Sequence, residues 1–172
     1  MSMTGDADDS LATRPSLLAR LKDWSHQTAW REFDHDYAPL IRNVARKAGL
    51  RDVEADEVAQ ETLIAVAKKI GAFEHPGRAG SFRAWLYQQA RWRIADQFRK
   101  RQAESAADRE SGGPAQSEDE TGTNAVGELP DAAASEFERI WDQEWRGRVQ
   151  QLAIARVKRR VSARQFQLFD LH

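Results

Sequence analysis

Two tryptophans and a cluster of basic residues lie close together in residues 81–102, SFRAWLYQQARWRIADQFRKRQ. If this segment is a helix with about 100° between successive residues, one side carries an apolar stripe that completes a core face without tryptophan. The stripe consists of Leu86, Ala90, Ile94 and Phe98. Almost opposite to it lie Trp85, Gln88, Trp92 and Arg99.

Indoles outside a core stripe can stack on nucleic-acid bases, which stabilises binding by roughly 1–3 kcal/mol per base. Arginine and lysine beside them can bind phosphates. This combination favours a nucleic-acid-binding helix. The alternatives are that Trp85 and Trp92 pack beneath neighbouring helices and that the basic residues form a solvated face.

Acidic residues dominate a second segment, DVEADEVAQETLIAVAKKI, which opens with acids and closes with Lys68 and Lys69 before Gly71. That polarity matches the helix dipole. Glu54, Glu57 and Glu61 form an acidic ridge on the predicted helix. The residues predicted to face the core are Val58, Thr62, Val66 and Ile70. The ridge is either a contact surface for a basic partner or a solvated face neutralised by the two lysines.

Helical periodicity also precedes these two segments. From Pro15, the residues Leu17, Leu18, Leu21 and Trp24 share a face, and a second run begins near Trp30 and meets a stop signal at Gly49. The second run contains Pro39, which predicts a kink or a turn. No segment alternates as a strand does, so the sequence predicts an all-α fold whose N-terminal helical bundle occupies residues 15–102.

Charge is unevenly distributed along the chain. The formal net charge is −1, but residues 102–136 contain nine acids and one base, so they carry −8 and the remainder carries +7. Residues 103–134 are poor in large apolar side chains, which predicts a flexible acidic linker. Residues 1–14 read as a disordered tail. Helix is predicted to resume at Ser135, with Ser135 and Glu138 as a capping box. The apolar stripe predicted for this helix consists of Phe137, Ile140, Trp141, Trp145, Val149 and Leu152.

Three motifs in this order resemble the second conserved region of extracytoplasmic-function (ECF) sigma factors of bacterial RNA polymerase, within the sigma-70 family. They are WREFDHDYAPLIRNVARKAGL, EADEVAQETL and WLYQQARWRIADQFRKR, within residues 24–102. The resemblance implies a transcription initiation factor, not an enzyme, that needs no cofactor. It would bind core RNA polymerase and recognise and melt the promoter minus-ten element.

The resemblance also assigns residues. Contact with the coiled coil of the polymerase β′ subunit is implied for Asp56, Glu57, Gln60 and Glu61. Contact with the non-template strand of promoter DNA is implied for Phe73, His75, Arg78, Ser81 and Phe82 in the loop, and for Trp85, Gln88, Trp92, Asp96, Arg99, Lys100 and Arg101 on the helix. Trp92 replaces the asparagine usual in the family, which predicts a different promoter preference. An anti-sigma factor is a possible further partner.

The C-terminal part departs from the family. Residues 135–172 resemble the opening of sigma region 4, and we expect them to lack its helix-turn-helix. A second capping pair, Ser162 and Gln165, precedes Phe166, Leu168, Phe169 and Leu171. The chain has no cysteine, no signal peptide and no membrane-length apolar run, so a cytoplasmic protein is expected.

Two other classes of function are compatible with parts of this pattern. A metal-dependent enzyme could use Glu57 and Glu61 with His35 or His75. A generic helical module that binds nucleic acid or protein would use the same basic and acidic faces without RNA polymerase. The chain lacks the lysine and spacing of a phosphate-binding P-loop.

Overall fold

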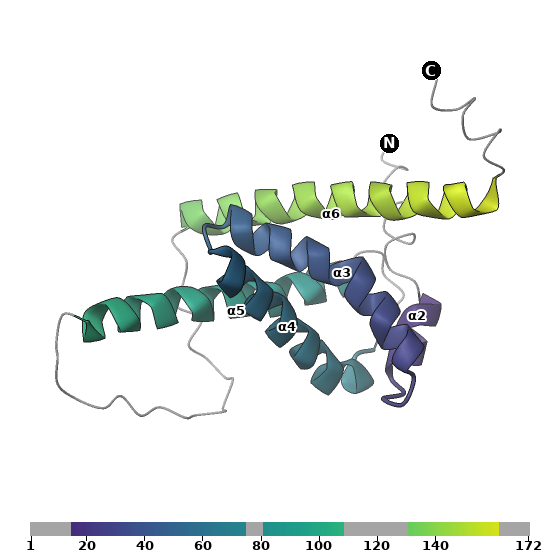
Figure 1. The fold of residues 1–172 in the computed structure, drawn as a ribbon, viewed down its shortest axis with the longest axis horizontal. Helices are drawn as coiled ribbons and strands as arrows, with labels where there is room; N and C mark the ends of the chain where they lie inside the picture. Colours follow the sequence, from purple (N-terminus) through teal and green to yellow (C-terminus); the bar gives the residue numbers. More distant parts are fainter. Residues whose placement is uncertain (1–14, 75–80, 109–130, 162–172) are drawn as a thin grey trace, which may run out of the picture.

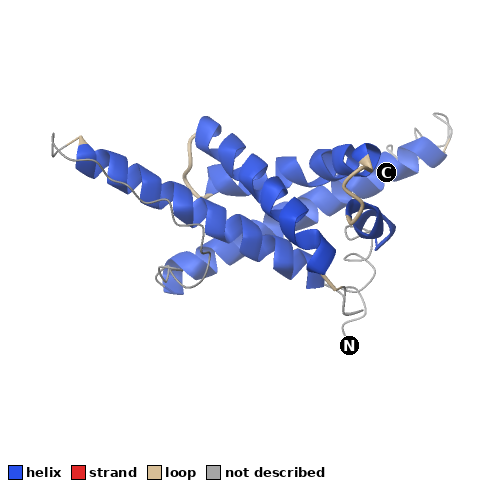
Figure 2. Cartoon of the chain, turned by 90° about the horizontal axis from the view of Figure 1, so that it is seen from below, coloured by secondary structure: helices blue, strands red, loops and turns tan. Residues whose placement is uncertain are grey.

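Helices account for nearly all of the described chain in the computed structural model, which confirms the predicted all-α class (Figures 1 and 2). The structure describes residues 15–74, 81–108 and 131–161. Its elements are α2 (Pro15–Leu21), α3 (Gln27–Lys47), α4 (Asp52–Lys69), the 3₁₀ helix η1 (Ile70–Ala72), α5 (Ser81–Ala107) and α6 (Asp131–Arg160). The acidic stretch 109–130, the tail before residue 15 and residues 162–172 lie outside the described residues.

The core lies between α3, α4 and α5, and it contains the side chains that the periodicity places there. Val58, Thr62 and Val66 of α4 and Ile70 of η1 are buried, as predicted. In α5, Leu86, Ala90 and Ile94 are buried and Phe98 packs against the same cluster. Each α5 stripe residue lies four positions from the next, so the stripe stays on one side of the helix along its length. The opposite face is left for other contacts.

Gly49 makes the sharp connection between α3 and α4. Its φ of 104° is in the left-handed region that glycine adopts without a steric cost. The Gly49 amide donates to the Arg46 carbonyl at 2.9 Å, and the Leu50 amide donates to the Ala45 carbonyl at 3.1 Å. These two bonds form a Schellman motif, which satisfies carbonyls at the end of α3. The predicted stop signal is thereby confirmed.

Three local predictions were wrong. Trp24 does not share the buried face of Leu17, Leu18 and Leu21, because α2 ends at Leu21 and the Trp24 side chain is 66% exposed. The turn predicted at Pro39 does not form, since α3 runs through it to Lys47; the kink predicted as the alternative stays a prediction. Ser135 is not the N-cap of the last helix, because α6 begins four residues earlier at Asp131.

The last helix, α6, packs lengthwise over the bundle (Figure 1). Its apolar stripe contributes Phe137, Trp141, Trp145 and Val149 to the same core cluster as α2 to α5. The Trp145 ring lies 6.1 Å from that of Tyr37 on α3, and the Trp141 ring lies 5.5 Å from that of Tyr87 on α5. The stripe was predicted, but this position on the bundle was not. The assignment of residues 15–102 and 135–172 to separate sigma regions stays a prediction.

In the part of the chain that the structure describes, no helix is both long and apolar enough to cross a membrane.

The last turns of α5 and of α6 extend away from the bundle in opposite directions (Figures 1 and 2). Helix α5 reaches Ala107, five residues past the predicted boundary of the bundle.

Candidate functional site

Trp85 and Trp92, on the outer side of α5, have different environments. The Trp85 indole is half-buried, 4.8 Å from the ring of Phe73 and 5.8 Å from that of Phe82 between ring centroids. Trp85 therefore packs against the core, as the packing alternative predicted. Trp92 is 37% exposed, so part of its indole faces solvent. Of the two, Trp92 exposes more of its indole for contact with a base.

Lys69, at the end of α4, lies beside Trp92. Its ammonium nitrogen is 5.2 Å from the centroid of the Trp92 ring and 3.4 Å from the side-chain oxygen of Gln89, to which it donates. Gln89 is itself buried. A cation at this distance over an indole is attracted to the ring and brings positive charge next to the stacking surface. Sequence spacing alone does not predict that Lys69 belongs to the site, because Trp92 is 23 residues away and only the packing of α4 on α5 brings the two side chains together.

Phe82 does not offer a contact surface, contrary to the implied DNA contact. Its side chain is fully buried, with edge-on contacts to Phe33 at 6.2 Å, Tyr37 at 5.5 Å and Phe73 at 6.0 Å between ring centroids. It anchors the first turn of α5 in the core. Phe73 itself is half-buried at the edge of this group. Aromatic type alone could not distinguish an anchor from a contact.

Other residues implied in DNA binding lie before α5 or on its outer side. Gln88 is exposed, and Asp96 accepts from Arg99 and lies 3.7 Å from Arg93. Ser81 begins α5. His75 and Arg78 lie outside the described residues.

The basic end of α5 contacts acids of α4. Lys100 lies 3.4 Å from Glu61, and Arg101 binds Glu54, with its Nε at 3.1 Å from one carboxylate oxygen. These two predicted phosphate-binding side chains thus pair with carboxylates of another helix, whereas Arg99 pairs with Asp96 of α5 itself. The spacing of the acidic ridge and of the basic cluster predicted both faces, but it did not show that they meet.

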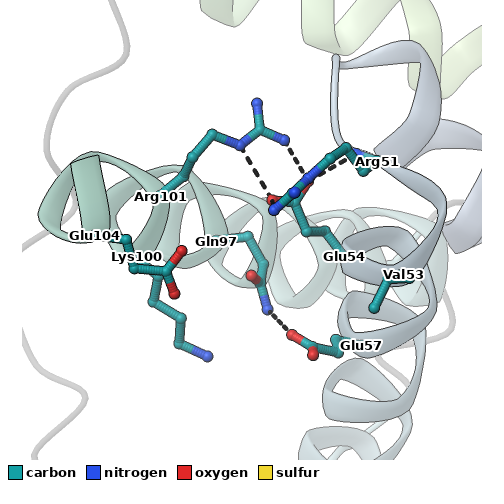
Figure 3. Close-up of a pocket in the computed structure, with 8 residues that line it drawn as sticks. All are labelled: Arg51, Val53, Glu54, Glu57, Gln97, Lys100, Arg101 and Glu104. Carbon is teal, nitrogen blue, oxygen red and sulfur yellow. Dashed lines mark hydrogen bonds and ion pairs between the residues drawn. The ribbon is translucent and has the colours of Figure 1, made fainter. Parts of the chain in front are cut away.

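Glu54 is the most enclosed of these acids. It accepts from Arg101 and from Arg51, whose guanidinium lies at 2.8 Å, and it also accepts from the Arg51 backbone amide at 2.7 Å (Figure 3). Hydrogen bonds from Arg101 and then Arg51 lower the pKa of the Glu54 carboxyl well below its usual value of 4.5. Glu54 therefore belongs to the junction of α4 and α5, not to an open acidic ridge as predicted. Arg51 and Arg101 are its partners.

The four residues implied in polymerase binding lie on α4. Asp56 forms an ion pair with Arg42 of α3, and Glu57 accepts from Gln97 of α5 at 2.8 Å. Gln60 is exposed, and Glu61 is half-buried beside Lys100. Asp56, Glu57 and Gln60 remain exposed enough for a partner to reach. Gln97 was missed by the sequence analysis, although a polar residue close to the apolar stripe of α5 was a signal for it.

A metal site has no support in the described residues, where no group of three or more His, Asp or Glu side chains is arranged to hold a metal ion. Glu57 and Glu61, proposed for such a site, contact Gln97 and Lys100 instead. The Glu-x-x-His spacing of helical di-metal proteins occurs at Glu32 and His35. There, Glu32 pairs with Arg20 and His35 contacts Asp36.

Comparison with known proteins relates the three central helices to a described family. The family model for sigma-70 region 2 matches residues 33–104, a range that covers most of α3, all of α4 and most of α5. No curated protein and no solved structure matches the chain. The matched range contains Trp92, the acids of α4 and the basic end of α5.

Proposed function

We propose that this protein binds core RNA polymerase through α4 and a promoter minus-ten element through α5. The similarity of residues 33–104 to sigma-70 region 2 supports a sigma-70 family RNA polymerase sigma factor. The match supports a role in promoter recognition and melting. The particular residues, the β′ coiled coil as the docking surface of polymerase and membership of the ECF subgroup are parts of the proposal.

The exposed indole of Trp92 is the single observation that carries this proposal. It lies opposite the buried stripe of α5, which is complete without it, and Lys69 adds a cation beside the ring. Packing in the core does not account for a large aromatic side chain that is partly exposed at this position. Stacking on an unpaired base would cover it, and the ammonium group of Lys69 would lie near the adjoining phosphate.

Such a surface can melt DNA without hydrolysing a nucleotide. A base can be recognised on its Watson–Crick edge after it leaves the stack, and unstacking costs a few kcal/mol. Stacking on the protein and phosphate contacts offset that cost. The non-template strand would therefore be held in its separated form by binding energy alone, and this role needs no catalytic residue.

The polymerase surface is proposed at Asp56, Glu57, Gln60 and Glu61. The first three are exposed on α4, and the matched range includes all four. A basic partner helix would find three carboxylates within two turns, and opposite charges steer such encounters. We further propose that the protein acts in the cytoplasm, with a possible anti-sigma factor as regulator.

The test is transcription in vitro with purified core RNA polymerase, the full chain and promoter fragments selected by their binding to the assembled complex. Trp92→Ala should reduce open-complex formation roughly tenfold or more, because one stacked base is lost, while polymerase binding persists. Trp24→Ala is the matched control, since Trp24 is also an exposed indole but lies between α2 and α3. Equal loss of opening in both variants would contradict the site.

The same assay tests α4. Glu57→Lys should weaken polymerase binding by at least about tenfold, because it places a like charge against a basic partner. Asp34→Lys, an exposed charge reversal on α3, is the control and should bind as the wild type does. Direct binding to RNA or duplex DNA, with no association with polymerase, would instead favour the generic nucleic-acid-binding module.

A further inference from the structure

Side chains that we assign to different partners touch one another at the junction of α4 and α5. Glu54 binds Arg101, Glu57 accepts from Gln97, and Glu61 lies beside Lys100. Figure 3 shows the first two contacts and the Lys100 side chain, which extends away from the guanidinium groups at Glu54. Glu57 and Glu61 belong to the proposed polymerase surface, whereas Lys100 and Arg101 belong to the proposed DNA surface. Of the three contacts, Glu61–Lys100 is the one that joins a residue of the proposed polymerase surface to a residue of the proposed DNA surface.

The three contacts differ in how easily they open. The Glu54 side chain is 9% exposed and is held by two guanidinium groups, so separating it from Arg101 would leave a charge enclosed without its partner. The side chain of Gln97 is buried. Glu61 and Lys100 have side chains 35% and 56% exposed, with 3.4 Å between the charged atoms. An exposed single ion pair of this kind is weak, and water or another ion can replace either partner.

Lys100 is consequently the group, among these three pairs, that can change partners. A phosphate oxygen competes for it with the Glu61 carboxylate, because both are anionic acceptors. Any basic residue of polymerase that binds Glu61 removes the same competitor. A hollow of about 290 Å³ lies on another side of Lys100, and the acids that line it are Glu54, Glu57 and Glu104. Glu54 and Glu57 have the partners already described.

We propose that Glu61 occupies Lys100 in the free protein as an internal substitute for DNA phosphate, and that contact of polymerase with Glu61 releases Lys100 for DNA. This inference rests on the proposed function. Whichever partner binds first breaks the Glu61–Lys100 pair, so the second partner binds without that opposition, and the coupling is reciprocal. An exposed pair limits the effect to about two- to fivefold in affinity.

The test measures the reaction of Lys100 with an amine-labelling reagent by peptide mass spectrometry, with exposed Lys22 as the internal reference. Glu61→Gln should raise Lys100 labelling about two- to fivefold in the free full-length chain. Asp52→Asn is the matched control: it also removes one acid from α4, but Asp52 pairs with Arg46 of α3. Adding core polymerase should raise Lys100 labelling in the wild type and not further in Glu61→Gln.

Fluorescence anisotropy with a single-stranded oligonucleotide at low salt supplies the second measurement. Glu61→Gln should bind more tightly than Asp52→Asn, by about two- to fivefold. Equal labelling of Lys100 in wild type and Glu61→Gln, or a fall in labelling when polymerase binds, would overturn the inference. Absence of any polymerase binding by the wild type would refute the proposed function itself, whereas binding with unchanged Lys100 labelling would refute only the coupling.

Discussion

Glu54 lies between the guanidinium groups of Arg51 and Arg101, with its side chain nearly enclosed. It joins the beginning of α4 to the end of α5, and Arg101 also donates to the Gly49 carbonyl at 3.4 Å. The Glu54 carboxylate thereby joins the beginning of α4 to Arg101, which lies 47 residues later in the sequence. The spacing of Glu54, Glu57 and Glu61 predicted a shared face, but which of these acids is covered depends on where α5 ends. That is a property of tertiary packing.

Replacing Glu54 tests this role. Glu54→Gln should lower the free energy of unfolding by roughly 1–3 kcal/mol at neutral pH, because enclosed donors lose their charged acceptor. The difference in free energy of unfolding between Glu54→Gln and the wild type should become smaller as the pH falls. The folded-state pKa of Glu54 is depressed, so its contribution is present above the usual value of 4.5 and is lost as pH decreases toward the folded pKa.

Urea denaturation of both proteins at pH 7 and at pH 3 provides the measurement. A gap that stays constant between these two pH values would show that the Glu54 carboxylate is not the titrating group. Glu136→Gln serves as the control, since Glu136 pairs at an exposed position on α6 with Arg139, where such pairs contribute little.

Among the helices, α3 contains Pro39 in its interior and continues past it to Lys47. Pro39 has no amide hydrogen, so the His35 carbonyl one turn earlier loses its helical donor. Arg148 of α6 donates to that carbonyl and, through Nε, to the Asp36 carbonyl at 2.8 Å. The proline predicted a kink or a turn because the sequence around it does not show that Arg148, 112 residues after Asp36, supplies a donor.

A double-mutant cycle tests this compensation. Arg148→Met should lower the free energy of unfolding by roughly 1.5–3 kcal/mol, since it removes a charged donor from two carbonyls and keeps an apolar stem. In a Pro39→Ala background the same change should cost less, because the alanine amide introduced there can then donate to the His35 carbonyl. Urea unfolding of the four proteins gives the coupling energy. A cost that is the same in both backgrounds would separate Arg148 from the proline.

At the scale of the whole molecule, α6 completes the core. Trp141 is almost fully buried, and its ring stacks 5.9 Å from that of Trp145. The periodicity of residues 135–152 predicted this stripe correctly, as it did the buried faces of α4 and α5. It could not predict what the stripe packs on, because an amphipathic helix has the same pattern beside any apolar partner. The candidate site was predictable to a similar degree. The sequence predicted Trp92 and the two charged faces, but it did not predict that Lys69 lies beside Trp92 or that the acids of α4 pair with the basic end of α5.

If α6 is part of one core, weakening it should destabilise the entire bundle. Trp141→Ala should lower the free energy of unfolding by about 3–5 kcal/mol in a single transition. Trp141→Phe should cost much less, because it keeps a ring and removes a buried indole N–H that has no hydrogen-bond partner among the described residues. Calorimetry distinguishes a single core from an independent C-terminal unit. An independent unit would give two separate unfolding transitions, and Trp141→Ala would lower the midpoint temperature of only one of them.

The packing of α6 also fixes the position and direction of its C-terminal end relative to the bundle. Its first half is clamped to α3 and α5 by Trp141 and Trp145, and its last turns continue past the bundle (Figure 1). Any part of the protein downstream of Val161 departs from a point fixed relative to Trp92, whatever the length of residues 109–130. One residue inserted into α6 after Val149 would swing that departure point by about 100° and advance it by about 1.5 Å. The packing of α6 on the bundle therefore determines the position of Val161.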